Sequence, residues 1–335
     1  YLAVRIAPAE GGRTNRYALV PIELGVDRFV QMPSENGSPF MLIEDLIRMH
    51  LDRLFPGQKV RECVPFRVTR NADMSVREEL APDLLSGMEE VLAARRTSDC
   101  VRLEIEAGST TMLLHWLVDC LQVKRDGIYA VDGPVDLSAF MAKCFVPGYD
   151  ELKDKDWDPQ PSPDVDPRLP MFQNVSRGDI LLNHPYDAFD PVVRMIEEAA
   201  DDPDVLAIKQ VLYRTSKESR IVSALMRAAE QGKYVTVIVE LKARFDEARN
   251  IGRARELEEA GAQVIYGIKG LKTHAKICMI LRREESGICR YMHFGTGNYN
   301  ESTAKIYSDI SYLTKNPYLG AEASKFFNTI TGFSQ

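Results

Sequence analysis

The pair His274 and Lys276 is the strongest candidate for chemistry in this sequence. On a strand, residues two apart project to the same face, so the imidazole and the ammonium would reach one target. Cations beside an imidazole disfavour its protonated form and leave a neutral, nucleophilic ring. The lysine could neutralise an attacked phosphate, and the amide of Asn298 could donate hydrogen bonds to its oxygens. We therefore predict nucleophilic attack on a phosphoryl group.

Two arginines lie within three residues of the ends of largely apolar runs that are typical of buried strands. Arg214 follows one run and Arg244 follows the next. Ligands of open α/β sheets bind beyond the carboxyl ends of the strands, so both guanidinium groups would approach one site. The spacing from Thr215 to Glu218 is that of a capping box, which would place Arg214 just before a helix N-terminus. These cations predict a phosphate-rich ligand.

The elements that would position these residues lie after residue 173. Three apolar runs alternate with two amphipathic helical patterns, and two further strand patterns follow as a hairpin. The strands are expected at 205–212, 234–241, 263–266, 276–282 and 289–294, and the helices at 218–231 and 247–260. This β-α-β-α-β order predicts an α/β domain with a mostly parallel sheet that is covered by helices.

The first half of the chain has a different order of predicted strands and helices. Strand and helix patterns in residues 1–146 follow no regular β-α-β order, which predicts an α+β domain. Residues 147–172 contain six prolines and many charged residues, and we expect an extended linker there. The predicted organisation is therefore a domain at 1–146, a linker at 147–172 and the α/β domain at 173–335.

Composition limits the class of protein. A chain of 335 residues with 45% hydrophobic and 27% charged residues is neither disordered nor a coiled coil. The net charge of −7 argues against nucleic acid as a partner but allows a locally basic site. No apolar run reaches the ~18–20 residues of a membrane span. The six cysteines form no C-x-x-C pair, which favours a reducing, cytoplasmic location, with peripheral membrane association as an alternative.

The segment around His274 resembles one half of the phospholipase D active-site motif. An H-x-K sequence is followed about twenty residues later by the glycine turn G-T-G-N. Leu281 stands where that motif carries an aspartate. A phosphodiesterase or nuclease that assembles two half-sites by dimerisation is therefore an alternative, and Leu281 and the pair Arg214 and Arg244 argue against it.

Longer strings resemble the polyphosphate kinase family, which transfers the terminal phosphate of ATP reversibly to polyphosphate. They include HPYDAFDPVV, IKQVLYRTSKESRIV, VTVIVELKARFDEARNI, GLKTHAKI and HFGTGNYNESTAKIYSDISYLT. Earlier segments such as PFRVTRNAD and YAVDGPVDL are similar to the head domain of that family. The resemblance implies a fragment with the head domain and the first of two phospholipase D-like C-terminal domains, without the N-terminal and second C-terminal domains.

The resemblance also implies roles for individual residues. His274 matches the histidine that becomes phosphorylated, and Tyr307 matches a tyrosine of the ATP site. Arg214 and Arg244 match two arginines that the family assigns to its Mg²⁺ site. A guanidinium group has no acceptor, so we expect both arginines to bind phosphate oxygens that in turn hold the ion.

The prediction is a two-step phosphoryl transfer through phosphohistidine at His274, with Lys276 and Asn298 at the transferred group. The expected ligands are ATP, ADP and polyphosphate, with Mg²⁺ as cofactor. The expected partner is a second copy of the protein. We expect the isolated fragment to be incomplete as an enzyme. A non-catalytic module that binds polyphosphate stays open as a further alternative.

Overall fold

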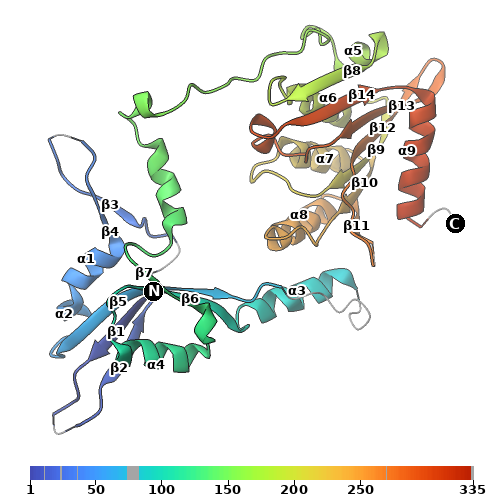
Figure 1. Cartoon of the computed structure of the whole chain (residues 1–335). Coiled ribbons are helices and arrows are strands. Elements are labelled where there is room, and N and C mark those ends of the chain that lie inside the picture. Colours follow the sequence, from blue (N-terminus) through green and yellow to red (C-terminus); the bar gives the residue numbers. More distant parts are fainter. Residues whose placement is uncertain (11, 23–24, 36, 74–82, 269, 333–335) are drawn as a thin grey trace. The chain divides into compact units, whose positions relative to one another are not determined.

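The computed structural model divides into two compact units (Figure 1). It describes residues 1–10, 12–22, 25–35, 37–73, 83–268 and 270–332. The first unit comprises Tyr1–Met74 and Ala93–Asp154, and the second comprises Lys155–Gln335 with Ser75–Leu92. Among the described residues, no helix has the length and apolar character to cross a membrane. The residues predicted to take part in chemistry all belong to the second unit.

The first unit is an α+β structure. Its strands are β1 (Leu2–Ile6), β2 (Arg16–Val20), β3 (Phe29–Gln31), β4 (Phe40–Leu42), β5 (Val60–Arg70), β6 (Cys100–Glu106) and β7 (Ile128–Val131). Its helices are α1 (Ile43–Met49), α2 (Leu51–Leu54), α4 (Thr111–Leu121) and the 3-10 helices η1 (Arg125–Gly127), η2 (Leu137–Phe145) and η3 (Asp150–Leu152). Five strands form one sheet in the order β2-β1-β5-β6-β7, and β3 pairs with β4.

The two faces of this sheet pack against different helices. Leu113 and Leu117 of α4 are four residues apart, so they share one helix face, which packs with Ala3 of β1. Leu2 and Val4 alternate with Ala3 and point to the other face, where they pack with residues of α1 and α2. The α+β prediction for this part of the chain agrees with what the structure describes.

The second unit is an α/β structure around a seven-stranded sheet. Its strands are β8 (Ile180–His184), β9 (Val205–Leu212), β10 (Tyr234–Val239), β11 (Gln263–Tyr266), β12 (Lys276–Glu284), β13 (Gly287–Gly295) and β14 (Asp309–Thr314). Its helices are α5 (Met171–Arg177), α6 (Asp190–Asp201), α7 (Arg220–Glu230), α8 (Glu247–Glu259), α9 (Pro317–Ile330) and the 3-10 helix η4 (Thr303–Lys305). The strand order is β11-β10-β9-β12-β13-β14-β8.

The sheet is mixed, so the prediction of a mostly parallel sheet is wrong. Strands β9, β10 and β11 run parallel, as predicted from the β-α-β-α-β order. The four remaining neighbouring pairs are antiparallel. The reason is that β12 follows β11 in sequence but pairs with β9, and then continues by a hairpin into β13. The α/β class itself is confirmed.

Helices cover both faces of this sheet. Figure 1 shows α6, α7 and α8 on one side of the strands and α9 on the other. The alternation of β9 explains this arrangement, because Ile208 and Leu212 pack into the core beneath α6, α7 and α8. Val211 points the opposite way and packs with Ala323 and Phe327 of α9. The strand therefore packs on both faces, as its mostly apolar sequence predicts, although it includes Lys209 and Gln210.

Helix α7 begins later than the capping-box spacing predicted. The N-cap is Ser219, whose hydroxyl accepts a hydrogen bond from the Val222 amide at 3.3 Å. The buried face of the helix starts directly afterwards, at Ile221 and Val222. Thr215 therefore lies in the loop before α7, and Arg214 is not at a helix N-terminus.

One helix of the first half packs into the second unit. Met88 of α3 (Leu84–Arg95) is 3% exposed and belongs to the core formed by α6, α7 and the sheet. For this reason the residues up to Leu92 group with the second unit. The predicted division at 1–146, 147–172 and 173–335 assigns this helix to the first domain, and that division stays a prediction.

Candidate active site

The predicted site residues converge on one edge of the seven-stranded sheet. Strands β9, β10 and β13 end at this edge. Strands β12 and β14 run antiparallel to the strands beside them, so they begin at the same edge. The flanking loops carry Arg214 after β9, Arg244 after β10, His274 before β12, Asn298 after β13 and Tyr307 before β14. Topology thus gathers residues that are up to 93 positions apart (307 minus 214).

The ring of Tyr213 is the centre of this site. The imidazole of His274 lies edge to face against it, with ring centroids 4.9 Å apart. The ammonium nitrogen of Lys276 lies 5.0 Å from the Tyr213 ring centroid, and that of Lys272 lies 5.6 Å away. The guanidinium carbon of Arg214 lies 5.7 Å from the same centroid. One histidine and three cations therefore surround a single aromatic ring.

His274 and Lys276 do not project from one strand face as predicted. Strand β12 begins at Lys276, so His274 lies in the preceding loop, where it is exposed. Lys276 is 6% exposed, and its Nζ donates a hydrogen bond of 2.5 Å to the backbone oxygen of His274. The ammonium therefore supports the main chain of the histidine, and both side chains meet at Tyr213.

The electrostatics favour a neutral imidazole. Partial burial, and then the charges of Lys276, Lys272 and Arg214, lower the pKa of His274 below its ordinary value. Burial also lowers the pKa of Lys276; the carboxylate of Asp309 opposes this change, and Arg214 adds to it. The expected effect of neighbouring cations on the histidine is thus present. A neutral ring has a free lone pair at one nitrogen and can act as a nucleophile.

The two arginines lie together but differ in their partners. Arg214 donates from Nη2 to the backbone oxygen of Arg244 at 3.0 Å, and its Nε lies 3.1 Å from a carboxylate oxygen of Asp246. Arg244 is exposed, and its guanidinium carbon lies 5.4 Å from the ring centroid of Phe245. Phe245 has a positive φ of 72°, which turns the chain sharply after Arg244. The charge of Arg214 is therefore partly compensated.

The expected Mg²⁺ site finds no protein ligands in this geometry. Arg214 and Arg244 are permanently protonated donors and cannot coordinate a cation. Among the described residues, no group of three or more histidine, cysteine, aspartate or glutamate side chains is arranged to hold a metal ion. The two arginines suit phosphate oxygens that would in turn hold the ion.

Asn298 and Tyr307 lie at the same edge without joining the cluster around Tyr213 in the described part of the chain. The side-chain oxygen of Asn298 is buried and has no hydrogen-bond partner among the described residues. Its turn is tight, because a Cβ at Gly297 would lie 2.6 Å from a carboxylate oxygen of Asp309. Tyr307 is 61% exposed in the turn before β14. Tyr307 is thus available to a ligand that covers this edge, whereas the Asn298 oxygen is enclosed.

Sequence analysis did not identify two residues that shape the site. Tyr213 is the first residue after β9, a position that predicts ligand contact, but aromatic residues at strand ends are too common to single it out. Asn250 of α8 donates from Nδ2 to the backbone oxygens of Tyr213 (2.8 Å) and Glu240 (2.9 Å), and so joins the ends of β9 and β10. An asparagine within a helical pattern gives no sign of this role.

A hollow of about 490 Å³ lies beside His274. Its lining is mostly apolar and includes Leu271, Ala275, Phe326 and Ile330, the last two from α9. The imidazole forms part of this lining, so it is reachable from outside the protein.

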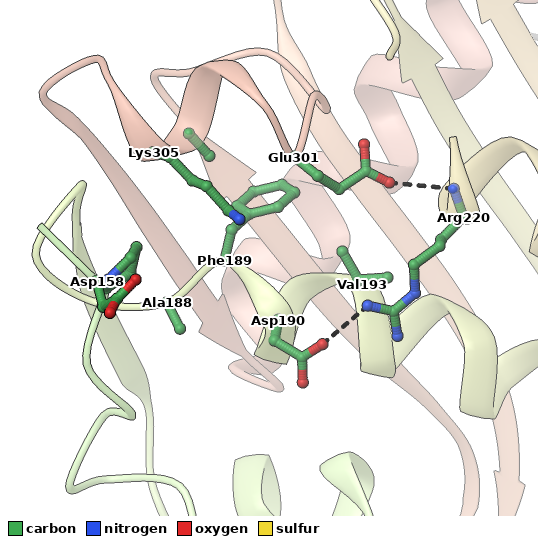
Figure 2. Close-up of a pocket in the computed structure, with 10 residues that line it drawn as sticks. Asp158, Ala188, Phe189, Asp190, Val193, Arg220, Glu301 and Lys305 are labelled. Carbon is green, nitrogen blue, oxygen red and sulfur yellow. Dashed lines mark hydrogen bonds and ion pairs between the residues drawn. The ribbon is translucent and has the colours of Figure 1, made fainter. Parts of the chain in front are cut away.

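A second pocket lies at the start of helices α6 and α7 (Figure 2). It has a volume of about 420 Å³, and its charged lining residues are Asp158, Asp190, Glu301, Arg220 and Lys305. Figure 2 shows Arg220 paired with Asp190 at 3.0 Å, while its backbone amide donates to Glu301 at 3.1 Å. Three carboxylates against two cations, one of them already paired, disfavour a polyanion. Phosphate therefore fits the edge around Tyr213 better than this pocket.

The fold and the site define an α/β protein with a cationic, histidine-containing ligand site. The family model "Polyphosphate kinase middle domain" matches residues 1–143, and "Polyphosphate kinase C-terminal domain 1" matches residues 170–335. Together these matches cover most of the chain. The chain belongs to the polyphosphate kinase family.

Individual relatives agree with this assignment. The chain is 57% identical over 318 residues to a polyphosphate kinase of Rhodopirellula baltica, covering 94% of this chain and 37% of that protein. It is 44% identical over 339 residues to a polyphosphate kinase of Halalkalibacterium halodurans, covering 100% of this chain and 48% of that protein. The crystal structure of a polyphosphate kinase from Porphyromonas gingivalis matches with a TM-score of 0.75 and 29% identity over 99% of this chain and 48% of that one. The chain thus spans about half, or less, of these relatives.

Proposed function

We propose that the protein containing this chain transfers the terminal phosphate of ATP reversibly to inorganic polyphosphate, through phosphohistidine at His274. The observation that carries this proposal is the cluster around Tyr213. His274, Lys276, Lys272 and Arg214 all lie close to the ring of this tyrosine, and the pKa of His274 is lowered. A nucleophile among cations suits attack on a phosphoryl group. The relatives' name, polyphosphate kinase, supplies the substrate class.

In the first step the neutral imidazole of His274 attacks the γ-phosphorus of ATP. A P–N bond forms while the bond from phosphorus to the β–γ bridging oxygen breaks, and ADP leaves with the electron pair of that bond. Arg214 and Arg244 bind phosphate oxygens, and Lys276 and the Asn298 amide stabilise the charge on the transferring group. Tyr307, exposed at the same edge, contacts the nucleotide.

In the second step a terminal phosphate oxygen of polyphosphate attacks the phosphorus of phosphohistidine. A P–O bond forms, the P–N bond breaks, and the imidazole regains its lone pair. Dividing the transfer into two displacements lets ATP and polyphosphate use one group of cations in turn. The same two steps in reverse return a phosphoryl group to ADP.

The remaining expectations follow from the same proposal. Magnesium enters with the nucleotide as part of the substrate, because the described residues offer no ligand cluster of their own. Self-association is proposed from the family resemblance. A reducing, cytoplasmic location is proposed because all six cysteines are free thiols, and peripheral membrane association remains part of that proposal.

The test is covalent labelling with ATP that carries radioactive phosphate at the γ position, in the presence of Mg²⁺. Both the intact protein and the 335-residue chain are incubated, since the chain spans about half the length of its relatives. We expect acid-labile, base-stable label on the intact protein and none in His274→Ala. His115→Ala, at an exposed histidine of the first unit, is the matched control and should keep the label.

The outcomes separate the proposal from its alternatives. Label in the intact protein alone means that the nucleotide site needs residues outside this chain. Turnover close to wild type in His274→Ala would overturn the phosphohistidine mechanism. Absence of label with retained binding of polyphosphate would favour a binding module, and hydrolysis of phosphodiester substrates would favour the phospholipase D-type alternative.

A further inference from the structure

We propose that Glu240 is a positioning residue that holds the loop of His274 in its reactive place. The inference rests on the proposed function, because it concerns the same histidine. Glu240 directly follows β10 and touches no reacting atom in our scheme. It acts through the main chain of two neighbouring loops, one before β12 and one after β10.

The two carboxylate oxygens of Glu240 divide between these loops. Oε2 accepts the backbone N–H of Thr273, the residue before His274, at 2.6 Å. Oε1 accepts the backbone N–H of Lys242 at 2.8 Å. The side chain of Lys242 adds a third link, since its Nζ donates to the backbone oxygen of Leu271 at 2.8 Å. One carboxylate thus ties the loop that carries the nucleophile to the loop that carries Arg244.

The burial of Glu240 is costly and needs a reason. Its side chain is 0% exposed. Its two oxygens accept the backbone amides of Thr273 and Lys242, whereas nearby Asp246 forms the ion pairs with Arg214 and Arg249. A buried carboxyl group loses its hydration, and hydrogen bonds compensate for that loss. The two backbone amides provide this compensation, one at each carboxyl oxygen. Loss of either hydrogen bond would leave a buried polar atom unsatisfied, so the side chain and the two amides hold one another in place.

The surroundings of Glu240 leave it little freedom. Asn250 donates to its backbone oxygen at 2.9 Å and to that of Tyr213 at 2.8 Å, which fixes the strand ends on either side of the carboxylate. Gly267 approaches from β11 with a φ of 60°, and a Cβ there would lie 3.7 Å from Oε2 of Glu240. The same Cβ would lie 3.3 Å from a methyl group of Leu84. Close backbone approach keeps the carboxylate in one position.

This arrangement has a direct consequence for the reaction. In-line attack needs the imidazole and the phosphate-binding arginine in fixed relation, and a misplacement of about 1 Å can lower the rate about 100-fold. The His274 side chain is exposed apart from its contact with Tyr213, so the position of its main chain also matters for attack. Glu240 and Lys276 do so from either side: Glu240 at the amide of Thr273, and Lys276 at the oxygen of His274.

Two substitutions distinguish geometry from charge. Glu240→Gln keeps the size but replaces one acceptor oxygen with an NH₂ group, which faces an N–H donor. Glu240→Asp keeps the charge and both oxygens but is one methylene shorter, so it cannot reach both amides. A role in positioning predicts slower labelling of His274 in both variants, by about 10–100-fold, with the affinity for ATP little changed.

The experiment measures three quantities on the intact protein and on both variants. They are the rate of His274 labelling from γ-labelled ATP, the dissociation constant of ATP, and hydrogen exchange of the peptides that contain Thr273 and Lys242. We expect faster exchange at both amides together with the slower labelling. Glu198→Gln is the matched control, because Glu198 also accepts a backbone amide, that of Met171 at 2.5 Å, but lies in α6 away from the site.

The results decide between the inference and the function on which it rests. Absence of label in the wild-type protein overturns the phosphohistidine mechanism and the role of Glu240 with it. A labelled wild type with unchanged labelling rates in both variants overturns the positioning role alone. Loss of a cooperative melting transition in both variants also overturns it, since Glu240 would then support the whole unit and not this loop.

Discussion

The imidazole of His274 lies edge to face against the ring of Tyr213, with an angle of 81° between the ring planes. This contact predicts that the aromatic ring fixes the orientation of the nucleophile. Tyr213→Ala should slow labelling of His274 by about 10–100-fold, because the imidazole and the cations lose their common support. Tyr213→Phe keeps the ring and should label close to the wild-type rate. Equal labelling rates in Tyr213→Ala and wild type would contradict this prediction.

The lowered pKa of His274 predicts a specific effect of Lys272. The charge of Lys272 disfavours the imidazolium form, so Lys272→Gln should raise the pKa of His274. The acid limb of the labelling rate against pH should then move to higher pH, because a larger fraction of the imidazole is protonated at a given pH. Histidine NMR titration of the free protein measures the pKa directly. Lys217→Gln, at an exposed lysine that does not act on His274, should leave it unchanged.

The tight turn at Gly297 predicts a stability effect. A Cβ at this position would lie 2.6 Å from Oδ2 of Asp309, whose Oδ1 accepts a hydrogen bond of 2.8 Å from the Thr296 hydroxyl. Gly297→Ala should lower the free energy of unfolding by about 1–3 kcal/mol, as expected for overpacking. Urea unfolding measures the change. Gly178→Ala is the control, because nothing lies within 4 Å of a Cβ there and its φ of 174° suits any residue.

Buried His293 predicts sensitivity of the fold to acid. Burial lowers its pKa to about 3, and Nδ1 lies 2.6 Å from the hydroxyl of Tyr299. Between pH 6.5 and 3 the unfolded state binds a proton that the folded state does not. Stability is therefore lost as the pH falls below 6.5, by about 1.4 kcal/mol per pH unit from this group.

The test of this prediction compares slopes and not absolute stabilities. His293→Asn should flatten the dependence of unfolding free energy on pH between about pH 6 and 4. His115→Asn, at an exposed histidine, should keep the wild-type slope. A wild-type slope in His293→Asn would show that other groups cause the acid sensitivity.

Much of the second unit could be predicted because its local signals agree with its packing. The predicted ranges of β9 and β11 equal the observed ones, since both are mostly apolar segments that end where the apolar residues stop. The start of α7 was predicted too early, because Ser219 and Thr215 are both good N-caps and only the buried face at Ile221 decides between them. The pairing of β12 with β9 could not be predicted, because it depends on contacts 68 or more residues apart in sequence (278 minus 210).

The sequence predicted which residues lie at the site, but not the hydrogen bonds between them. Residue types placed His274, Lys276, Arg214 and Arg244 near one sheet edge, where the structure has them. The hydrogen bond from Lys276 to the oxygen of His274 could not be predicted, because a backbone acceptor leaves no trace in the sequence. The roles proposed for these residues, and for Asn298 and Tyr307, stay predictions.

The hairpin of β12 and β13 offers a practical attachment point. Strand β12 starts beside His274 and runs for nine residues, so its far end lies about 30 Å from the edge that carries His274. The turn there exposes Glu285 and Ser286. A fluorophore or an immobilising resin coupled at Ser286→Cys, with the exposed Cys120 and Cys144 replaced by serine, would leave the approach to His274 clear. The tethered protein would allow the proposed phosphoryl transfer to be followed over successive cycles.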